Sequence, residues 1–363
     1  MSSENQQKTE WADLHIHSAQ SDDGNISIDE IIELTSGTHE TANPIKMIAI
    51  TDHEEFDFDG LEKGLEFARE KGIQLIPGIE ISTEDTLFGF EKVHVVSYFP
   101  DYKPEELRNS IIYEIAKEMQ KEKNARNDKY KRILVSYGLL TPEEAKNIDF
   151  GRSKATLVQK LFDKYKEKGE IEFEEGETKT TKSIKDISGV WQLVEDRRFR
   201  QDREKKSAET VIWATTTNGG IPVIAHPLLL RYKETRECFL TRALQDYKKE
   251  KKINLQAVNV FFDFFNSYWE SENRLGLEIH YPYTKTREYR EFEQDPLYQE
   301  GVETLINIIS QYCKDKGIRM SGGSDYHGPS SKEHMNIGDA KEHINIGDGK
   351  ICLDDAKRLL KIN

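Results

Sequence analysis

The stretch from Ala12 to Ser18 carries two histidines, His15 and His17, one residue apart within an apolar run. Alternation of side chains along a β-strand would put both histidines on the same face. Two imidazoles at this spacing can bind one divalent metal ion, because neutral imidazole is the commonest protein ligand for such ions. A His-x-His pattern also arises by chance, so its weight depends on what the rest of the chain adds.

Similar side chains lie at the ends of other short apolar runs. In a parallel α/β barrel, the strand ends that carry function meet at one face. The set holds imidazoles and carboxylates without a thiolate, which suits Mn²⁺, Fe²⁺ or Zn²⁺. Nine candidates exceed what one ion can use, so the sequence predicts two or three divalent ions. The candidate metal ligands are His15, His17, Asp22, His53, Glu80, His94, His226, Asp325 and His327.

Other histidines and carboxylates are interpreted as structural. Glu278 and His280 lie on one expected strand, and we expect them in the core or behind the ligands. His334 and His343 belong to a nine-residue duplication within 332–349, which is too short and too few in copies for a repeat fold. We interpret this duplication as local and without a role in metal binding.

Seven short apolar runs predict the strands that place the candidate ligands. Amphipathic segments separate them, such as 27–36, where Ser27 is a candidate N-cap, and 59–71, which stops at Gly72. Strands that alternate with helices in this way are typical of a parallel α/β fold. The expected strands are 11–16, 46–51, 74–81, 93–98, 221–226, 276–280 and 318–323.

The alternation breaks between the fourth and fifth strands. A long helical pattern over 104–138 closes at Gly138, and 142–213 remains mostly helical and strongly charged. The expected organisation has three parts. They are a first barrel part over 11–100, a helical insertion over 101–213 that caps the barrel and binds substrate, and a second barrel part with the C-terminal tail over 214–363.

Composition narrows the range of partners. The net charge of −14 over 363 residues argues against non-specific binding to long nucleic acid. Residues 117–206 nevertheless hold 23 Lys and Arg against 18 Asp and Glu, so this segment is the better candidate for binding an anion. Three scattered cysteines, a polar N-terminus and the lack of a long apolar window predict a cytoplasmic protein that does not enter a membrane. No motif points to a protein partner.

The ligands belong to motifs that follow one another along the chain. These are Asp13-Leu14-His15-x-His17, Ser21-Asp22, Thr51-Asp52-His53, Pro77-Gly78-Ile79-Glu80, His94, Ala225-His226-Pro227 and Gly323-Ser324-Asp325-Tyr326-His327-Gly328. Together they resemble the polymerase and histidinol phosphatase (PHP) superfamily over about residues 12–328. The resemblance implies a distorted seven-stranded (β/α) barrel with a trinuclear metal site. It assigns His15, His17, Glu80 and Asp325 to one ion, Glu80, His94 and His226 to a second, and Asp22, His53 and His327 to a third.

The insertion carries a second resemblance. Arg126-Asn127-Asp128-Lys129, followed by Leu134 and Gly138, is similar to a helix of stand-alone PHP phosphoesterases. Those enzymes act on nucleoside 3′,5′-bisphosphates and on the 5′ ends of short RNAs. Gly151-Arg152-Ser153-Lys154-Ala155 lies where that group has Arg-x-His-Ala, and here Lys154 replaces the histidine. Lysine supplies charge there without the titration of histidine. The resemblance implies that Arg126, Arg152 and Lys154 bind substrate.

We therefore expect a metal-dependent phosphoesterase that hydrolyses phosphate monoesters of a small substrate, with a nucleotide among the candidates. A hydroxide that bridges two ions would attack phosphorus, and Asp22, Glu80 and Asp325 are the carboxylates expected to act in catalysis. The alternative is a nuclease for short single-stranded DNA or RNA, with the aromatic run Phe261–Tyr268 stacking on bases. Packing against the barrel is the simpler interpretation of that run. A third hypothesis, a metal-bound module without turnover, is disfavoured because no ligand is missing.

Overall fold

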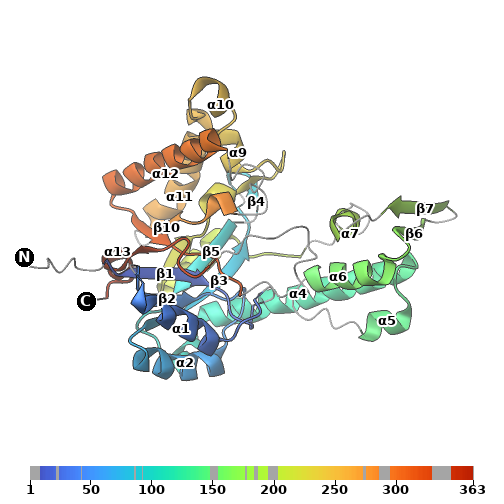
Figure 1. The fold of residues 1–363 in the computed structure, drawn as a ribbon, viewed down its shortest axis with the longest axis horizontal. Coiled ribbons are helices and arrows are strands. Elements are labelled where there is room, and N and C mark those ends of the chain that lie inside the picture. Colours follow the sequence, from blue (N-terminus) through green and yellow to red (C-terminus); the bar gives the residue numbers. More distant parts are fainter. Residues whose placement is uncertain are drawn as a thin grey trace, which may run out of the picture.

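A nearly closed sheet of eight strands forms the centre of the molecule in the computed structural model (Figure 1). The order of strands in the sheet is β11-β10-β8-β5-β3-β2-β1-β12. Their bounds are β1 (Trp11–Ile16), β2 (Ile45–Ile50), β3 (Gln74–Thr83), β5 (Val93–Tyr98), β8 (Ile221–Ile224), β10 (Gly276–His280), β11 (Arg319–Gly322) and β12 (Ile351–Cys352). The structure describes residues 9–21, 24–41, 43–85, 87–91, 93–147, 154–175, 178–183, 187–194, 203–272, 275–285, 295–328 and 345–362.

All seven expected strands are present, which confirms the predicted barrel. The eighth strand, β12, pairs antiparallel with β1. It is only two residues long, which is too short to be predicted from a sequence pattern. The barrel approaches closure where the chain after β11 meets β1, because the His17 N–H donates to the Tyr326 carbonyl at 2.8 Å. Gly323 permits this contact, since a Cβ there would lie 2.6 Å from the backbone nitrogen of His15.

The expectation of a parallel sheet is wrong for β5. This strand runs antiparallel to both neighbours, with His94 opposite Ser82 and Val95 opposite Ile224. Only the nine residues 84–92 join β3 to β5, and their described part includes β4 (Phe90–Glu91), whereas a parallel crossover needs a dozen residues or more. His94 therefore lies at the start of its strand. The reversed direction brings that start to the barrel end where the other strands finish.

Helices cover the outside of the barrel (Figure 1). The predicted N-cap is confirmed, because Ser27 accepts a hydrogen bond from the Glu30 N–H at the start of the first helix. Gly72 follows the second helix in a left-handed conformation with φ 67°. The barrel helices are α1 (Ile28–Gly37), α2 (Phe58–Glu70), α8 (Ala208–Thr217), α9 (Phe239–Ala243), α10 (Tyr247–Glu250), α11 (Leu255–Glu272), α12 (Pro296–Lys316) and α13 (Leu353–Leu360), with 3-10 turns at Thr38–Glu40, Pro227–Leu229 and Tyr283–Lys285. A short strand, β9 (Arg231–Tyr232), pairs with β4.

The aromatic run forms part of α11 and packs inside the molecule. Phe261, Phe264 and Phe265 are at most 1% exposed and belong to the barrel core. Rings buried to this degree are not available to stack on bases. None of the described helices is long and apolar enough to cross a lipid bilayer.

The long helical pattern after the fourth expected strand divides into α3 (Pro104–Leu107) and α4 (Ile111–Ser136). Ser110 causes the division, because its hydroxyl accepts from the Tyr113 N–H and caps α4. The N-terminal half of α4 packs on the barrel, while its far end extends away and carries the rest of the insertion (Figure 1). The remaining elements there are α5 (Pro142–Asn147), α6 (Lys154–Tyr165), β6 (Glu170–Glu175), β7 (Thr178–Ser183) and α7 (Ile187–Val194).

Two features of the segment 101–213 were not expected. The first is the antiparallel hairpin of β6 and β7, which lies in a segment interpreted as helical. The second is a separate apolar core, which includes Tyr130, Leu134 and Leu157. Helix α8 lies within the same segment of sequence but packs on the barrel strands β5 and β8.

Candidate metal centre

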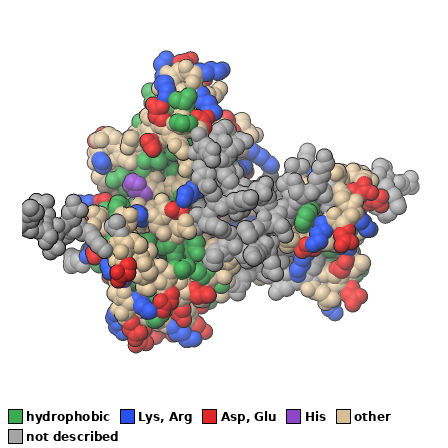
Figure 2. All heavy atoms as spheres, in the orientation of Figure 1, with side chains coloured by type: hydrophobic (Ala, Val, Ile, Leu, Met, Phe, Trp, Pro, Cys, Tyr) green, Lys and Arg blue, Asp and Glu red, His purple; other side chains and the backbone are tan. Residues whose placement is uncertain are grey.

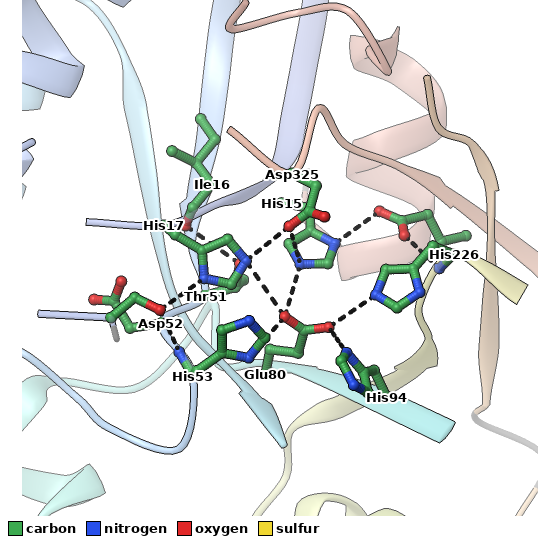
Figure 3. Close-up of polar contacts among 12 residues, drawn as sticks. His15, Ile16, His17, Thr51, Asp52, His53, Glu80, His94, His226 and Asp325 are labelled. Carbon is green, nitrogen blue, oxygen red and sulfur yellow. Dashed lines mark hydrogen bonds and ion pairs between the residues drawn. The ribbon is translucent and has the colours of Figure 1, made fainter. Parts of the chain in front are cut away.

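Figure 3 shows the barrel end at which histidines and carboxylates converge. They come from six places in the sheet that are distant in sequence. His15 is on β1, with His17 just after it, and His53 follows β2. Glu80 is on β3 and His94 on β5, while His226 follows β8 and Asp325 and His327 follow β11.

The carboxylate of Glu80 is the centre of this cluster and is fully buried. Five imidazole nitrogens lie within 3.3 Å of its two oxygens. A carboxylate offers about four lone-pair positions, so five nitrogens exceed what hydrogen bonding alone would assemble. Oε2 is 3.2 Å from His15 Nε2, 3.3 Å from His17 Nε2 and 3.2 Å from His53 Nδ1, and Oε1 is 2.7 Å from His94 Nδ1 and 3.1 Å from His226 Nε2.

Asp325 supplies the second carboxylate. Its Oδ1 lies 2.9 Å from His17 Nε2 and 3.5 Å from His15 Nε2, while its Oδ2 accepts a hydrogen bond from the Tyr281 hydroxyl at 2.8 Å. The Asp325 N–H donates to the His15 carbonyl at 2.8 Å, which ties the loop after β11 to β1. The ring of His327 stacks on His17 with centroids 4.3 Å apart.

The described residues offer three groups of ligand atoms, each within 4.8 Å. Atoms about 2.1 Å from one ion lie roughly 3–4 Å apart, so each group has the spacing of a divalent metal site. Nε2 of His17 is buried and makes no hydrogen bond of good geometry, although Asp325 is 2.9 Å away, as expected of an atom aimed at a cation. The groups are His15, His17, Glu80 and Asp325; His53, Glu80 and His94; and His17, His53 and His327.

These groups can be compared with the sets that the resemblance implied. The first group has the same four members. In the second, His53 joins Glu80 and His94, while His226 contacts the same Glu80 oxygen as His94. Of the third set, His53 and His327 come together, but Asp22 lies outside the described residues.

Glu278 lies behind the ligands, as expected. It is 1% exposed, its Oε1 is 3.1 Å from His15 Nδ1, and its Oε2 accepts the His226 N–H at 2.6 Å. This contact orients the His15 ring so that Nε2 faces Glu80. The matching expectation for His280 is wrong, because its side chain is exposed. The register with β11 shifts between Glu278 and His280, and such an irregularity turns the next side chain away.

Two buried aspartates from the motifs brace loops rather than join the cluster. Asp13 accepts from the Ser324 N–H at 2.9 Å and from the Gly347 N–H at 2.6 Å, which places the residue before Asp325. Asp52 accepts from the backbone N–H and the hydroxyl of Ser18, at 2.6 and 2.7 Å. These roles depend on long-range contacts, so strand periodicity could not assign them.

The cluster sets the charge of its own members. Burial would raise the pKa of Glu80, but His53, His15 and His94 outweigh it and hold that pKa well below its usual range. Burial lowers the pKa of His94 to about 4, in spite of Glu80. Burial also opposes a charge on His15, yet Glu278 and Glu80 hold its pKa well above the usual value. Near neutral pH the centre therefore offers a carboxylate anion and at least one neutral imidazole, the forms that bind metal.

Backbone strain gathers at the same place. Among the described residues, six non-glycine residues have positive φ, and three of them lie in or beside the cluster. These are Glu54 at 57°, His226 at 30° and Asp325 at 56°. Such conformations persist only where surrounding contacts enforce them, and they are typical of functional sites.

Arg126 lines a cavity of about 680 Å³ between α4 and the segment that returns to the barrel. Its Nε and Nη2 donate to Asn127 Oδ1 at 3.3 and 3.1 Å, which orients the guanidinium. Four cations and three carboxylates line this cavity, and on the face drawn in Figure 2 acidic side chains lie over α1 and α2 with some Lys and Arg among them. The lining residues are Glu84, Glu122, Arg126, Lys129, Arg203, Glu204 and Lys205.

Several predicted residues lie outside the described part of the chain. Arg152 is one, as are His334 and His343. Lys154 begins α6, but its side chain is not described. Sequence reasoning also missed Tyr281 and Arg203, for which no local pattern gave a signal.

Comparisons with known proteins concern the family and the fold of the chain. A family model for the PHP domain matches residues 13–209. Among 21 matching solved structures is a Bifidobacterium adolescentis protein assigned to the metal-dependent phosphoesterases, with 16% identity, 97% of this chain and 96% of that chain covered, and a TM-score of 0.57. Another is an amidohydrolase from Chromobacterium violaceum with bound sulfate and no metal, with 18% identity, 88% of each chain covered and a TM-score of 0.51. At these identities the likeness is one of fold. No curated protein sequence matches the chain.

Proposed function

The chain belongs to the family of PHP-domain proteins and is a metal-dependent hydrolase, and we propose that it hydrolyses phosphate monoesters of a small phosphorylated substrate. The observation that carries the proposal is the convergence of five imidazole nitrogens on Glu80, with Asp325 beside them. Only nitrogen and oxygen ligands take part, and together they form more than one group of metal-binding spacing.

The residues divide the work of binding the ions. His15, His17, Glu80 and Asp325 would hold one ion; Glu80, His94, His226 and His53 surround the place of a second; His53 and His327, with Asp22 as proposed from the resemblance, would hold a third. Divalent ions at these places lower the pKa of water and neutralise phosphoryl oxygens. Mn²⁺, Fe²⁺ and Zn²⁺ all suit this donor set.

The protein itself keeps the ligands in place for the reaction. Glu278 fixes the ring of His15, and Tyr281 fixes one oxygen of Asp325 so that the other faces His17. The surrounding histidines hold the pKa values of Glu80 and Asp325 well below their usual range, so both carboxylates would attract cations. The proposed catalytic carboxylates are Asp22, Glu80 and Asp325.

The cavity beside α4 supports a small phosphorylated molecule as substrate. Its volume of about 680 Å³ falls within the range of small-molecule sites. One of its lining residues, Arg203, pairs with Glu54, the residue after the candidate ligand His53. We propose that a phosphoryl group lies at the metal centre while the rest of the substrate extends toward Arg126, with Arg152 and Lys154 as further binding residues.

The nuclease hypothesis loses one of its supports. Its aromatic platform was the run on α11, and the rings of Phe261 and Phe264 are fully buried. The four cations in the lining of the cavity still suit a short oligonucleotide end, so the nuclease remains the second arm of the test. Binding without turnover is the third arm.

Product analysis with Mn²⁺-loaded protein separates these functions. The substrates are a nucleoside 3′,5′-bisphosphate, a small phosphate monoester and a 5′-labelled single-stranded oligonucleotide. His17→Ala and Glu80→Ala remove candidate ligands, and His280→Ala is the matched control, because His280 is an exposed histidine on β10. Free phosphate released by the wild type and the control, but by neither ligand variant, is the expected result. A shortened oligonucleotide without free phosphate would indicate the nuclease, and metal binding without any product would contradict both enzymatic functions.

A further inference from the structure

Glu54 lies between two parts of the candidate metal centre. It follows His53 directly, it is 1% exposed, and its backbone is left-handed with φ 57°. Its N–H donates to the Glu80 carbonyl at 2.8 Å. The backbone of Glu54 therefore ties the turn that carries His53 to the strand that carries Glu80. The Glu54 carboxylate does not take part in this contact.

That carboxylate meets Arg203. Two nitrogens of the guanidinium contact the two oxygens of Glu54, a bidentate arrangement, and Nη1 also donates to the Met119 carbonyl of α4 at 3.3 Å. The Arg203 side chain is only 9% exposed. A buried carboxylate without a cationic partner is costly, so the contact with Arg203 stabilises the buried position of Glu54.

The segment around Arg203 is itself held against the barrel. The Glu84 N–H donates to the Lys206 carbonyl at 3.2 Å, and the Ala208 N–H donates to the Glu84 carbonyl at 3.1 Å. From the other side, Gln120 of α4 donates its side-chain N–H to the Glu54 carbonyl at 3.3 Å. The turn after His53 is thus clamped between α4 and the chain that returns from the insertion.

We propose that Arg203 is a positioning residue for the metal centre, which holds the turn at His53 and Glu54 in the geometry that lets His53 bind an ion. The proposal rests on the proposed metal-dependent function. Without the Arg203 guanidinium, the unpaired Glu54 carboxylate turns toward water and the strained backbone relaxes. Nδ1 of His53 then moves away from Glu80 Oε2. The segment around Arg203, which leads from the insertion back to the barrel, then supports the metal centre, although it supplies none of the predicted ligands.

The test uses full-length protein and three variants at this pair. Arg203→Met leaves the carboxylate unpaired, Arg203→Lys keeps the charge without the planar fork, and Glu54→Gln with Arg203→Met removes both charges. Arg108→Met is the matched control, because Arg108 is a half-exposed arginine that pairs with Asp59 and Glu62 on the surface. Each protein is titrated with Co²⁺, and the readouts are the number of ions bound, their Kd and the visible absorption spectrum.

We expect Arg203→Met to raise the Kd of one ion about tenfold and to change the Co²⁺ spectrum, while Arg108→Met behaves as the wild type. The double variant should recover most of the affinity, since no buried charge is left unpaired. Unchanged Kd and spectrum in Arg203→Met would overturn the proposal, as would a double variant as impaired as the single one. If Arg203→Met does not fold, Arg203→Lys decides, with a shifted spectrum expected and a wild-type spectrum as the contrary result.

Failure of this proposal is distinguishable from failure of the proposed function. Metal titration reads the role of Arg203 without any substrate. A wild-type protein that binds Co²⁺ but releases no phosphate would contradict the phosphatase and leave the positioning role standing. If the wild type releases phosphate but the Arg203→Met variant binds Co²⁺ as the wild type does, the phosphatase is supported and the positioning role of Arg203 is contradicted.

Discussion

The barrel end and the insertion hold their charged side chains in different ways. At the barrel end, each described candidate ligand lies on a strand or within five residues after one. Four of these eight are buried and the other four are partly buried, and backbone hydrogen bonds tie the neighbouring loops together. In the insertion, the cations of the cavity lie on one long helix and on the segment that returns from it. Positions set by a sheet are rigid, whereas positions on a projecting helix can change without disturbing the sheet. The difference suits fixed chemistry at the barrel and adjustable recognition in the insertion.

Helix α4 joins these two regions and shows where they meet. Its buried apolar side chains up to Met119 belong to the barrel core, and its buried apolar side chains from Tyr130 onward belong to the core of the insertion. Between them, Lys123 and Asn127 are only 5% and 8% exposed, although both are polar. A polar section of α4 therefore separates the two apolar cores, and Glu122, Arg126 and Lys129 of this section line the cavity.

Removal of the central carboxylate should give the largest effect. Glu80→Gln keeps the size of the side chain but loses the charge that five imidazole nitrogens face. We expect phosphate release to fall by roughly 10³-fold, with loss of bound metal. Metal analysis and steady-state kinetics check this, with Glu33→Gln on the surface of α1 as control. Retention of full metal content would show that Glu80 does not link the ions.

Damage to the insertion core should separate stability from chemistry. Leu157 is fully buried in that core, and Leu157→Ala should cost about 2–5 kcal/mol of local stability. Hydrogen exchange should speed up in α6 while the metal content stays at the wild-type level. Leu305→Ala on α12 is the matched change in the barrel core and should leave exchange in α6 unchanged. Equal loss of protection in both regions would mean that they fold as one unit.

Removal of the Arg126 charge from the cavity lining should weaken substrate binding more than it slows turnover. Arg126→Met removes a guanidinium held by Asn127, and we expect KM to rise about tenfold, with kcat and metal content nearly unchanged. Arg132→Met is the control, since Arg132 is an exposed arginine on the same helix. A fall in kcat with constant KM would instead place Arg126 at the reacting phosphoryl group.

The smallest effect is expected at the support of Asp325. Tyr281→Phe removes one hydroxyl, which donates to Asp325 Oδ2 at 2.8 Å, and leaves the ring in place. We expect a loss of kcat of about three- to tenfold, because the carboxylate keeps its charge but loses its fixed orientation. Tyr98→Phe, at a buried tyrosine that contacts Ser321, is the comparison and should leave kcat unchanged. An unchanged kcat in Tyr281→Phe would show that the backbone of Asp325 alone sets its orientation.

Local pattern was sufficient for much of the fold and of the site. The seven expected strands are present, the N-cap at Ser27 is confirmed, and eight of the nine candidate ligands fall within the described residues and come together. The reason is that strand and helix periodicity depend on residues that are near one another in the sequence. Histidine and carboxylate residues at strand ends can likewise be recognised as candidate ligands from residue type alone. Asp22 and Arg152, outside the described residues, stay predictions.

Only the tertiary structure decided which partners each residue meets. The antiparallel direction of β5, which brings His94 to the centre, depends on its pairing with β3 and β8. The role of Glu278 depends on a contact with His15, 263 positions away in the chain, and Arg203 meets Glu54 across 149 positions. The same holds for His280, which a shift in register turns outward. The sequence by itself determined which side chains are available for chemistry. Their convergence on Glu80 was decided by closure of the sheet, because distances across a barrel depend on strand order and direction rather than on any local pattern.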